Sequence, residues 1–342
     1  MGTKRETGRI REDAQKDKLY QFLKSRKKIL TLEQLSDHFD TGVGKVRKMM
    51  EELSHAGHNI QIVTGGGIEL SRDIPKADPT RINAEKMAGK VVRFGLTGDN
   101  HLGSKYARLD VLNCLFDIWQ KEGIKDVYQL GNMIDGEARF NIFDLVARGI
   151  DGQVKYFVDN WPARKGITTQ FITGDDHEGW YVQREGINIG QVIQDEAERA
   201  GRKDLKYLGH MEHDVIFAGK KQQTVMRLVH AGGGSAYATS YSVQKIVESY
   251  QGGEKPHILL VGHYHKAEYG YPREVHTLQC GTTEDQTPFM RKKKIQAHLG
   301  GWIVEFTLTE MGVVSRFKCE WIPFFDKGFY DKAWKYHYRG KS

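Results

Sequence analysis

The chain has 342 residues, of which 39% are hydrophobic and 28% are charged, and its formal net charge is +7. This length suffices for two domains, or for one large domain with an appendage. No apolar run approaches the roughly 18 residues of a membrane span, and residues 1–18 are polar rather than a signal sequence. We therefore expect a cytoplasmic protein without membrane association, and the positive charge favours a polyanionic partner.

The three cysteines are Cys114, Cys280 and Cys319, which are scattered along the chain without any C-x-x-C spacing. An odd number of scattered cysteines is typical of reduced thiols in a reducing compartment. This distribution argues against a disulfide framework and against a structural zinc site.

The first part of the chain, residues 1–74, has the pattern of a small helical domain. Apolar residues keep helical spacing in residues 17–26, and Thr31 with Gln34 gives the pattern of a capping box at the start of a second helix. A third helix is predicted in "TGVGKVRKMMEELSHAG", where it ends at a glycine. The segment "IQIVTGGGIEL" that follows predicts a β-hairpin.

Three helices followed by a hairpin resemble a winged helix-turn-helix domain, and this resemblance implies DNA binding. The third helix places Lys45, Arg47 and Lys48 off its apolar stripe, where a recognition helix would meet phosphates or base edges. The alternative is a domain that contacts proteins, with these charges simply solvated. Residues 75–89 carry prolines and mixed charge without a clear period, and we interpret them as a linker.

Beyond the linker, in residues 90–325, strand patterns alternate with helix patterns, and five apolar strands end in polar residues. Open α/β sheets gather a functional site at the carboxyl ends of their strands. One histidine after one strand is usually a core residue, but five such strand ends predict a shared site. The polar residues are Asp99 and His101, then Asn132 and Asp135, then Asp176, His177 and Glu178, then His230, and finally His263 and His265.

The types of these residues indicate metal chemistry. Carboxylates and imidazoles without thiolates suit divalent ions such as Mn²⁺, Fe²⁺ or Zn²⁺. Two groups one residue apart at a strand end, as in Asp99-x-His101 and His263-x-His265, project to the same side. The ligands suffice for two ions, which together could hold a phosphoryl group, generate a hydroxide at neutral pH and stabilise an in-line transition state.

The order of these motifs resembles that of the calcineurin-like metallophosphoesterases, and the resemblance spans residues 90–325. It implies an α/β fold of four layers, α-β-β-α, in which two mixed sheets lie between helices. The late strands "GGWIVEFTLTE" and "GVVSRFKCEWIPF" would complete the second sheet, and residues 326–342 would form a C-terminal tail. The motifs are Asp99-x-His101, Gly131-Asn132-x-x-Asp135, Asp176-His177-Glu178, His230 and Gly262-His263-x-His265.

The resemblance also implies a role for each matching residue. His177 matches the imidazole that contacts the scissile phosphate and helps the leaving oxygen, and Asp135 would orient it. Asn132 occupies the position of the ligand that bridges two divalent ions, which we expect to be Mn²⁺, with Fe²⁺, Zn²⁺ or Mg²⁺ as alternatives. The ligands of the first metal would be Asp99, His101 and His265, and those of the second would be Asp176, His230 and His263.

Two positions depart from the family pattern. Asn132 stands where the family has its bridging Asp, and Asp176 stands where the family has Asn. A neutral amide is a poor bridge and leaves two dications less screened. Either the carboxylate has moved to position 176, or Asn132 is an inactivating replacement. At the level of sequence we favour the second interpretation, because conserved charge alone does not recreate the bridging geometry.

The predicted function is that of a two-metal-dependent phosphodiesterase, most similar to the Mre11-like nuclease branch that also occurs in phages. Its partner would be DNA, duplex or single-stranded, cut by exo- or endonuclease action. The alternatives are a DNA-binding protein with a defective metal site, and a phosphodiesterase acting on small or cyclic nucleotides. A basic run, "MRKKKIQAH", is either a solvated face or a phosphate contact. No sequence feature indicates an oligomeric state.

Overall fold

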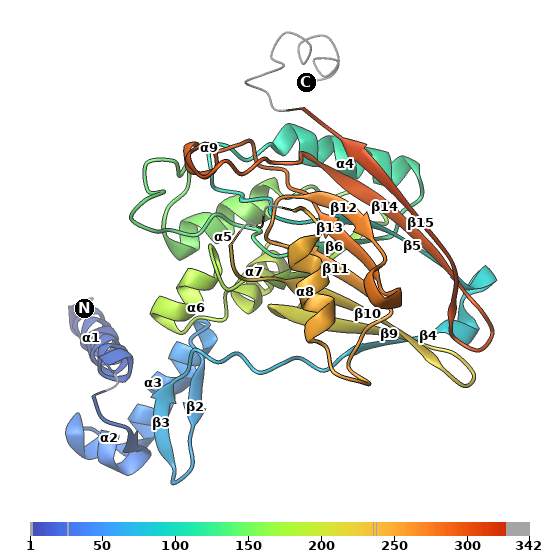
Figure 1. Ribbon diagram of the computed structural model, residues 1–342. Coiled ribbons are helices and arrows are strands. Elements are labelled where there is room, and N and C mark those ends of the chain that lie inside the picture. Colours follow the sequence, from blue (N-terminus) through green and yellow to red (C-terminus); the bar gives the residue numbers. More distant parts are fainter. Residues whose placement is uncertain (1–2, 26, 235, 237, 326–342) are drawn as a thin grey trace. The chain divides into compact units, whose positions relative to one another are not determined.

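The computed structural model describes residues 3–25, 27–234, 236 and 238–325 of the chain (Figure 1). They belong to two compact units. The first unit comprises Met1–Pro75 and Trp180–Val192, and the second comprises Lys76–Gly179 and Ile193–Ser342. The expected C-terminal tail, 326–342, lies outside the described residues. None of the helices in the described ranges combines the length and the hydropathy that crossing a bilayer requires.

The first unit contains the predicted order of three helices and a hairpin. Thr31 Oγ1 accepts the N–H of Gln34 at 3.3 Å, and Gln34 Oε1 accepts the N–H of Thr31 at 2.9 Å, so the predicted capping box is confirmed. Residues Leu19, Leu35 and Val46 are fully buried in its core. The elements are α1 (Thr3–Ser25), β1 (Leu30–Thr31), α2 (Leu32–His38), α3 (Val43–His55), β2 (Ile60–Ile62) and β3 (Gly67–Leu70), with the sheet in the order β1-β3-β2.

A distant segment also belongs to the first unit. Helix α6 (Gly179–Glu185) ends in Glu185, whose carboxylate accepts hydrogen bonds from the Tyr20 hydroxyl and, at 2.6 Å, from Lys24 Nζ. Beyond α6, Ile187 forms an antiparallel bridge with His58. The predicted N-terminal domain, residues 1–74, is therefore extended by a segment that no local sequence pattern had connected to it.

The second unit contains two six-stranded sheets. Sheet I has the order β15-β14-β5-β6-β7-β8, with β5 to β8 parallel, and sheet II has the order β12-β13-β11-β10-β9-β4. The strands are β4 (Thr80–Asn83), β5 (Val91–Thr97), β6 (Asp126–Leu130), β7 (Thr168–Thr173), β8 (Leu205–His210), β9 (Glu212–Ala218), β10 (Gln223–His230), β11 (Ile258–Gly262), β12 (Ala267–Gly270), β13 (His276–Cys280), β14 (Gly300–Leu308) and β15 (Val314–Pro323).

Helices cover the outer faces of both sheets, and the main core lies between the sheets (Figure 1). Trp119 of α4 lies so close to sheet I that a Cβ on Gly95 would be 2.8 Å from its ring. Val247 of α8 packs against Leu259 on the outer face of sheet II. The predicted four-layer α-β-β-α fold is therefore confirmed. The other helical segments are η1 (Ala84–Lys86), η2 (Ala88–Lys90), α4 (Leu109–Lys121), α5 (Gly149–Asn160), α7 (Ile189–Arg199), α8 (Tyr241–Ser249), η3 (Pro272–Glu274) and α9 (Pro288–Lys293).

Two expectations need correction. The late strands β14 and β15 do not complete the second sheet, because β14 pairs antiparallel with β5 and so extends sheet I. The sequence reading of 75–89 as a linker is also wrong at 80–83, where β4 pairs in parallel with β9 and His213 Nε2 accepts the N–H of Thr80 at 3.2 Å. A four-residue edge strand is too short for its alternation to be recognised in the sequence.

Candidate metal centre

The five predicted strand ends meet in the second unit. The loops after β5 and β6 are joined because the N–H of Asp99 donates to the carbonyl of Gly131 at 2.9 Å. The two sheets are joined there because Asp99 Oδ2 accepts the N–H of His263 at 2.8 Å. The predicted gathering of polar residues at the carboxyl ends of the strands is thus what the structure shows.

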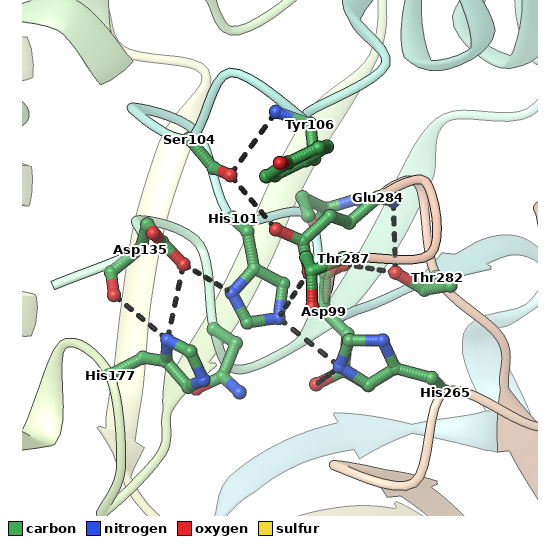
Figure 2. A network of polar contacts seen from close by, with 12 residues as sticks. Asp99, His101, Ser104, Tyr106, Asp135, His177, His265, Thr282, Glu284 and Thr287 are labelled. Carbon is green, nitrogen blue, oxygen red and sulfur yellow. Dashed lines mark hydrogen bonds and ion pairs between the residues drawn. The ribbon is translucent and has the colours of Figure 1, made fainter. Parts of the chain in front are cut away.

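The first cluster consists of Asp99, His101 and His265, whose ligand atoms all lie within 4.8 Å of one another. His101 Nε2 and His265 Nε2 are 3.2 Å apart, and His265 Nε2 is 3.8 Å from Asp99 Oδ1 (Figure 2). Burial raises the pKa of Asp99, and burial together with the nearby His101 lowers the pKa of His265 well below its usual value. Imidazoles and a carboxylate crowded in this way are arranged like the ligands of a cation.

The second cluster consists of Asp176, His230 and His263, which also lie within 4.8 Å of one another. Asp176 Oδ1 is 3.1 Å from His230 Nε2, and Asp176 Oδ2 is 3.3 Å from His263 Nδ1. Burial opposes ionisation of Asp176, but hydrogen bonds from the two imidazoles outweigh it and hold the pKa of Asp176 well below its usual range. Burial likewise opposes protonation of His230, but the Asp176 contact raises the pKa of His230 to about 9.

Three of the imidazoles are fixed by a second contact. Each uses one ring nitrogen to donate to an acceptor of the protein, which leaves the other ring nitrogen facing its cluster. Such an outer partner sets the tautomer and the orientation of a metal-binding imidazole. The pairs are His101 Nδ1 with Asp135 Oδ1 at 3.0 Å, His230 Nδ1 with the carbonyl of Leu130 at 2.6 Å, and His263 Nε2 with the carbonyl of Gly233 at 2.7 Å.

Asn132 lies beside the second cluster. Its N–H donates to Glu178 Oε1 at 2.7 Å, whereas its Oδ1 is buried and has no hydrogen-bond partner among the described residues. A Cβ on Gly174 would lie 2.8 Å from His230 Nε2 and 3.0 Å from Asn132 Oδ1. Both atoms therefore border the same small volume, and any side chain at position 174 would collide with them.

These observations fit divalent cations in both clusters. Asp99 Oδ1 and Asn132 Oδ1 are buried polar atoms without hydrogen-bond partners in the described part of the chain, and leaving such atoms unsatisfied costs free energy. The oxygen and imidazole donors suit Mn²⁺, Fe²⁺ or Zn²⁺. The clusters contain six of the seven residues that the sequence predicted as metal ligands, and the seventh, Asn132, lies beside the second cluster.

His177 and Asp135 form the edge of the site next to the first cluster. His177 Nδ1 donates to the carbonyl of Asp135 at 2.8 Å and lies 3.2 Å from Asp135 Oδ1 (Figure 2). Burial disfavours the charged imidazole, but the Asp135 contacts raise the pKa of His177 to about 10. The His177 side chain is 22% exposed, whereas that of His101 is 1% exposed. Asp135 therefore orients two imidazoles, of which only His177 can be reached from solvent.

His101, Asp135 and His177 also fall within 4.8 Å of one another. Both imidazoles direct Nδ1 at the same carboxylate, so hydrogen bonding accounts for this group without a third ion. The contacts hold the pKa of Asp135 below its usual range, although burial opposes this.

The backbone at the site is strained. Six non-glycine residues have φ between 49° and 91°, a region that side chains rarely adopt and that costs on the order of 1 to 3 kcal/mol per residue. Strain of this kind persists where the surrounding structure enforces it, and it is concentrated at functional sites. The residues are Asp99, His101, Asn132, His177, His263 and His265.

Two buried carboxylates were given no role by the sequence. Glu178 also accepts the N–H of Gly174 at 2.9 Å, and burial raises the pKa of Glu178 to about 7. Glu284 accepts the Ser104 hydroxyl at 3.0 Å, lies 3.8 Å from His101 Nε2, and has its pKa raised to about 7 by burial (Figure 2). The polar run that follows β13 is a sixth strand end of the same kind, and this signal could have identified Glu284.

The predicted nucleic-acid-binding residues belong to α3 of the first unit and to neither cluster. Arg47 and Lys48 are exposed and Lys45 is half-buried, while Val46 between them is fully buried. Lys48 Nζ lies 3.7 Å from Glu52. The three charges therefore lie off the buried stripe of the helix, as its spacing predicted, with Lys45 at the half-buried edge.

Comparison with known proteins gives distant likenesses. No protein-family model and no curated protein matches the chain. An archaeal phosphodiesterase is 9% identical with a TM-score of 0.35, over 68% of this chain and 100% of that one. Zinc-complexed Vps29 from Entamoeba histolytica is 13% identical with a TM-score of 0.34, over 68% and 100%. A 5'-nucleotidase described as putative, from Staphylococcus aureus, is 12% identical with a TM-score of 0.41, over 69% and 55%. These likenesses concern the fold alone.

Proposed function

We propose that the chain is a metal-dependent phosphodiesterase that hydrolyses DNA. The observation that carries this proposal is the pair of ligand clusters, each with one carboxylate and two imidazoles, bordered by His177. Divalent ions in these clusters would hold the phosphoryl oxygens, lower the pKa of a water molecule and stabilise the charge that develops during in-line displacement.

The residues of the chain have separable tasks in this reaction. The first cluster is buried, and Asp99 would be its anionic ligand to a cation, while Asp176 would be the anionic ligand of the second cluster. His177 carries a proton at neutral pH because its pKa is raised to about 10. Since Asp135 engages Nδ1, His177 can donate the Nε2 proton to the leaving oxygen, so that the departing group leaves as an alcohol.

We further propose that the carboxylate of the second metal has moved to position 176. Asp176 contacts both imidazoles of its cluster through its two oxygens, and the buried amide oxygen of Asn132 borders the same volume. Asn132 then acts as a neutral oxygen ligand. The strained backbone and the hydrogen bonds around the site support an active enzyme. This proposal reverses the preference from the sequence alone, which was for Asn132 as an inactivating replacement.

The assignment of DNA as substrate, and of the Mre11-like branch, rests on charge and on the first unit. The net charge of +7 favours a polyanion, and α3 carries exposed Arg47 and Lys48 on its solvent face. Replacing Lys45, Arg47 and Lys48 by Ala should weaken duplex binding and reduce the salt dependence by up to about 2 to 3 units. Unchanged affinity and slope would assign the first unit to protein contacts instead.

The test of the proposed activity is hydrolysis with Mn²⁺, Mg²⁺ or a chelator. The substrates are bis-p-nitrophenyl phosphate, a cyclic nucleotide, and single-stranded, linear duplex and circular duplex DNA. We expect Mn²⁺-dependent cleavage of DNA and of the small ester, abolished by the chelator and by Asp176→Ala. DNA binding without cleavage of any ester would instead indicate a DNA-binding protein with a defective site. Cleavage of the nucleotide but not of DNA would indicate a small-nucleotide phosphodiesterase.

A further inference from the structure

Three exposed phenylalanines of the second unit lie outside the two clusters. Phe140, Phe143 and Phe289 are 62%, 86% and 52% exposed. The rings of Phe140 and Phe289 are stacked with their centroids 5.9 Å apart and their planes at 29°. This stacking joins the loop 137–148 to α9, which are far apart in the sequence. We call Phe140, Phe143 and Phe289 the aromatic rim.

Positive charges lie beside the aromatic rim. Arg139 is exposed next to Phe140 in the chain, and residues 291–294, one arginine and three lysines, are exposed on and directly after α9. The helix is held by Met290, which is buried, and by Thr287 Oγ1, which accepts the N–H of Met290 at 3.2 Å. The anchored helix therefore turns its basic residues to solvent beside the exposed rings.

The loop 137–148, which carries Phe140 and Phe143, is held to the candidate metal centre by hydrogen bonds. Asn141 Nδ2 donates to Asp135 Oδ2 at 3.0 Å, and Asp135 is the residue that orients His177. The N–H of Val146 donates to the carbonyl of Gly103 at 2.8 Å, which ties the loop to the segment that follows the ligand His101. Phe140 and Phe143 are thus carried by a loop that is tied to the site, and Phe289 stacks on Phe140.

We propose that the aromatic rim binds unpaired bases of a single-stranded nucleic-acid segment next to the scissile phosphate. This inference rests on the proposed function and specifies its substrate. Exposed rings offer faces on which bases stack, and the adjacent cations match the phosphates of the same strand. Bases within a duplex are already stacked on each other and expose only their edges. The basic charge around the aromatic rim selects a polyanion over a neutral protein surface.

Binding is measured by fluorescence anisotropy of a labelled single-stranded phosphorothioate oligonucleotide in Ca²⁺. The variant in which Phe140, Phe143 and Phe289 are all changed to Ala should bind at least about tenfold more weakly, since each lost base stack typically weakens binding severalfold or more. Changing all three to Trp should preserve binding. The matched control is Tyr271→Ala, because Tyr271 is 55% exposed and lies beside η3 rather than α9.

An abasic oligonucleotide of the same length separates stacking from charge. The triple Ala variant should bind it as the unaltered chain does. The variant with Lys292→Ala and Lys293→Ala should bind both strands more weakly, with a salt slope lower by up to about 1.4 units. Unchanged binding of the normal strand by the triple Ala variant would overturn the inference, and so would an equal loss on the abasic strand.

Hydrolysis of bis-p-nitrophenyl phosphate keeps this inference distinguishable from the proposed activity. The small ester has no bases, so the triple Ala variant should hydrolyse it at the rate of the unaltered chain while losing efficiency on the oligonucleotide. A lack of ester hydrolysis by the unaltered chain would overturn the proposed activity, and the binding comparison would still decide the role of the aromatic rim.

Discussion

The two ligand clusters have the same composition but different surroundings. Asp99 of the first cluster is fully buried and burial raises its pKa, whereas the Asp176 side chain is 28% exposed and its pKa is held low by two imidazoles. Burial therefore dominates the pKa of Asp99, whereas hydrogen bonds dominate the pKa of Asp176. The first cluster is therefore the more buried of the two, and the second is more open to solvent at its carboxylate.

The largest effect is expected from removing the carboxylate of the buried cluster. Asp99→Asn should lower ester hydrolysis by about a thousandfold or more, because a divalent ion stabilises the transition state by several kcal/mol. It should also reduce Mn²⁺ binding, measured by calorimetry, from two ions to one. Asp175→Asn is the control, because Asp175 precedes Asp176 in the chain but belongs to neither cluster. Full activity of Asp99→Asn would refute the role of this cluster in holding an ion.

The next largest effect is expected at His177, which lies next to the first cluster and is partly exposed to solvent. His177→Ala should lower DNA cleavage by about a hundredfold to ten-thousandfold, which is the usual range for a general acid. Mn²⁺ binding should stay at two ions. The loss should be smaller for bis-p-nitrophenyl phosphate, since its leaving group needs no proton. Equal losses on both substrates would show that His177 does not protonate the leaving oxygen.

A smaller effect is expected from restoring a carboxylate at position 132. If Asp176 carries the relocated carboxylate, Asn132→Asp should change ester hydrolysis by less than about tenfold, because it adds negative charge where one carboxylate already serves the second cluster. The measurement compares the rate of ester hydrolysis at saturating Mn²⁺ between the unaltered chain and Asn132→Asp. An increase of several orders of magnitude would instead identify Asn132 as an inactivating replacement.

The smallest effect is on the pH dependence of stability in the presence of a chelator. His230 has its pKa raised from 6.5 to about 9, so its contribution to the free energy of unfolding is complete below about pH 6.5 and is lost as the pH rises towards 9. His265 has its pKa lowered, so its contribution is present above 6.5 and is lost as the pH falls below it.

Urea unfolding from pH 5 to 9 of the chelated protein checks these signs. His230→Gln should flatten the decline on the alkaline side, and His265→Gln should flatten the decline on the acid side. If His230→Gln instead flattened the acid-side decline and His265→Gln the alkaline-side decline, the stated contributions of the two histidines would be wrong.

The residues of the clusters could be predicted because each follows a local pattern. Apolar strands that end in polar residues identified Asp99, His101 and the other ligands, and the capping box at Thr31 marked α2. Features made by long-range pairing left no such pattern. The contact of Glu185 with Tyr20 and the place of β14 beside β5 depend on segments far apart in the sequence.

The chemistry at position 132 was also only partly predictable. The sequence located Asn132 at the place of a bridging ligand, but it could not show where the amide oxygen points. In the structure that oxygen is buried beside His230, while Asp176 reaches both imidazoles of the second cluster. The orientation of these side chains is the basis for our proposal that the carboxylate has moved to position 176.

The proposed function requires that each cluster holds a divalent ion. Anomalous diffraction at the manganese edge, from crystals grown with Mn²⁺, tests it directly. We expect two peaks about 3.5 to 4 Å apart. One should lie among Asp99, His101 and His265, and the other among Asp176, His230 and His263 with Asn132 Oδ1 beside it. No peak, a single peak, or peaks at other residues would contradict it.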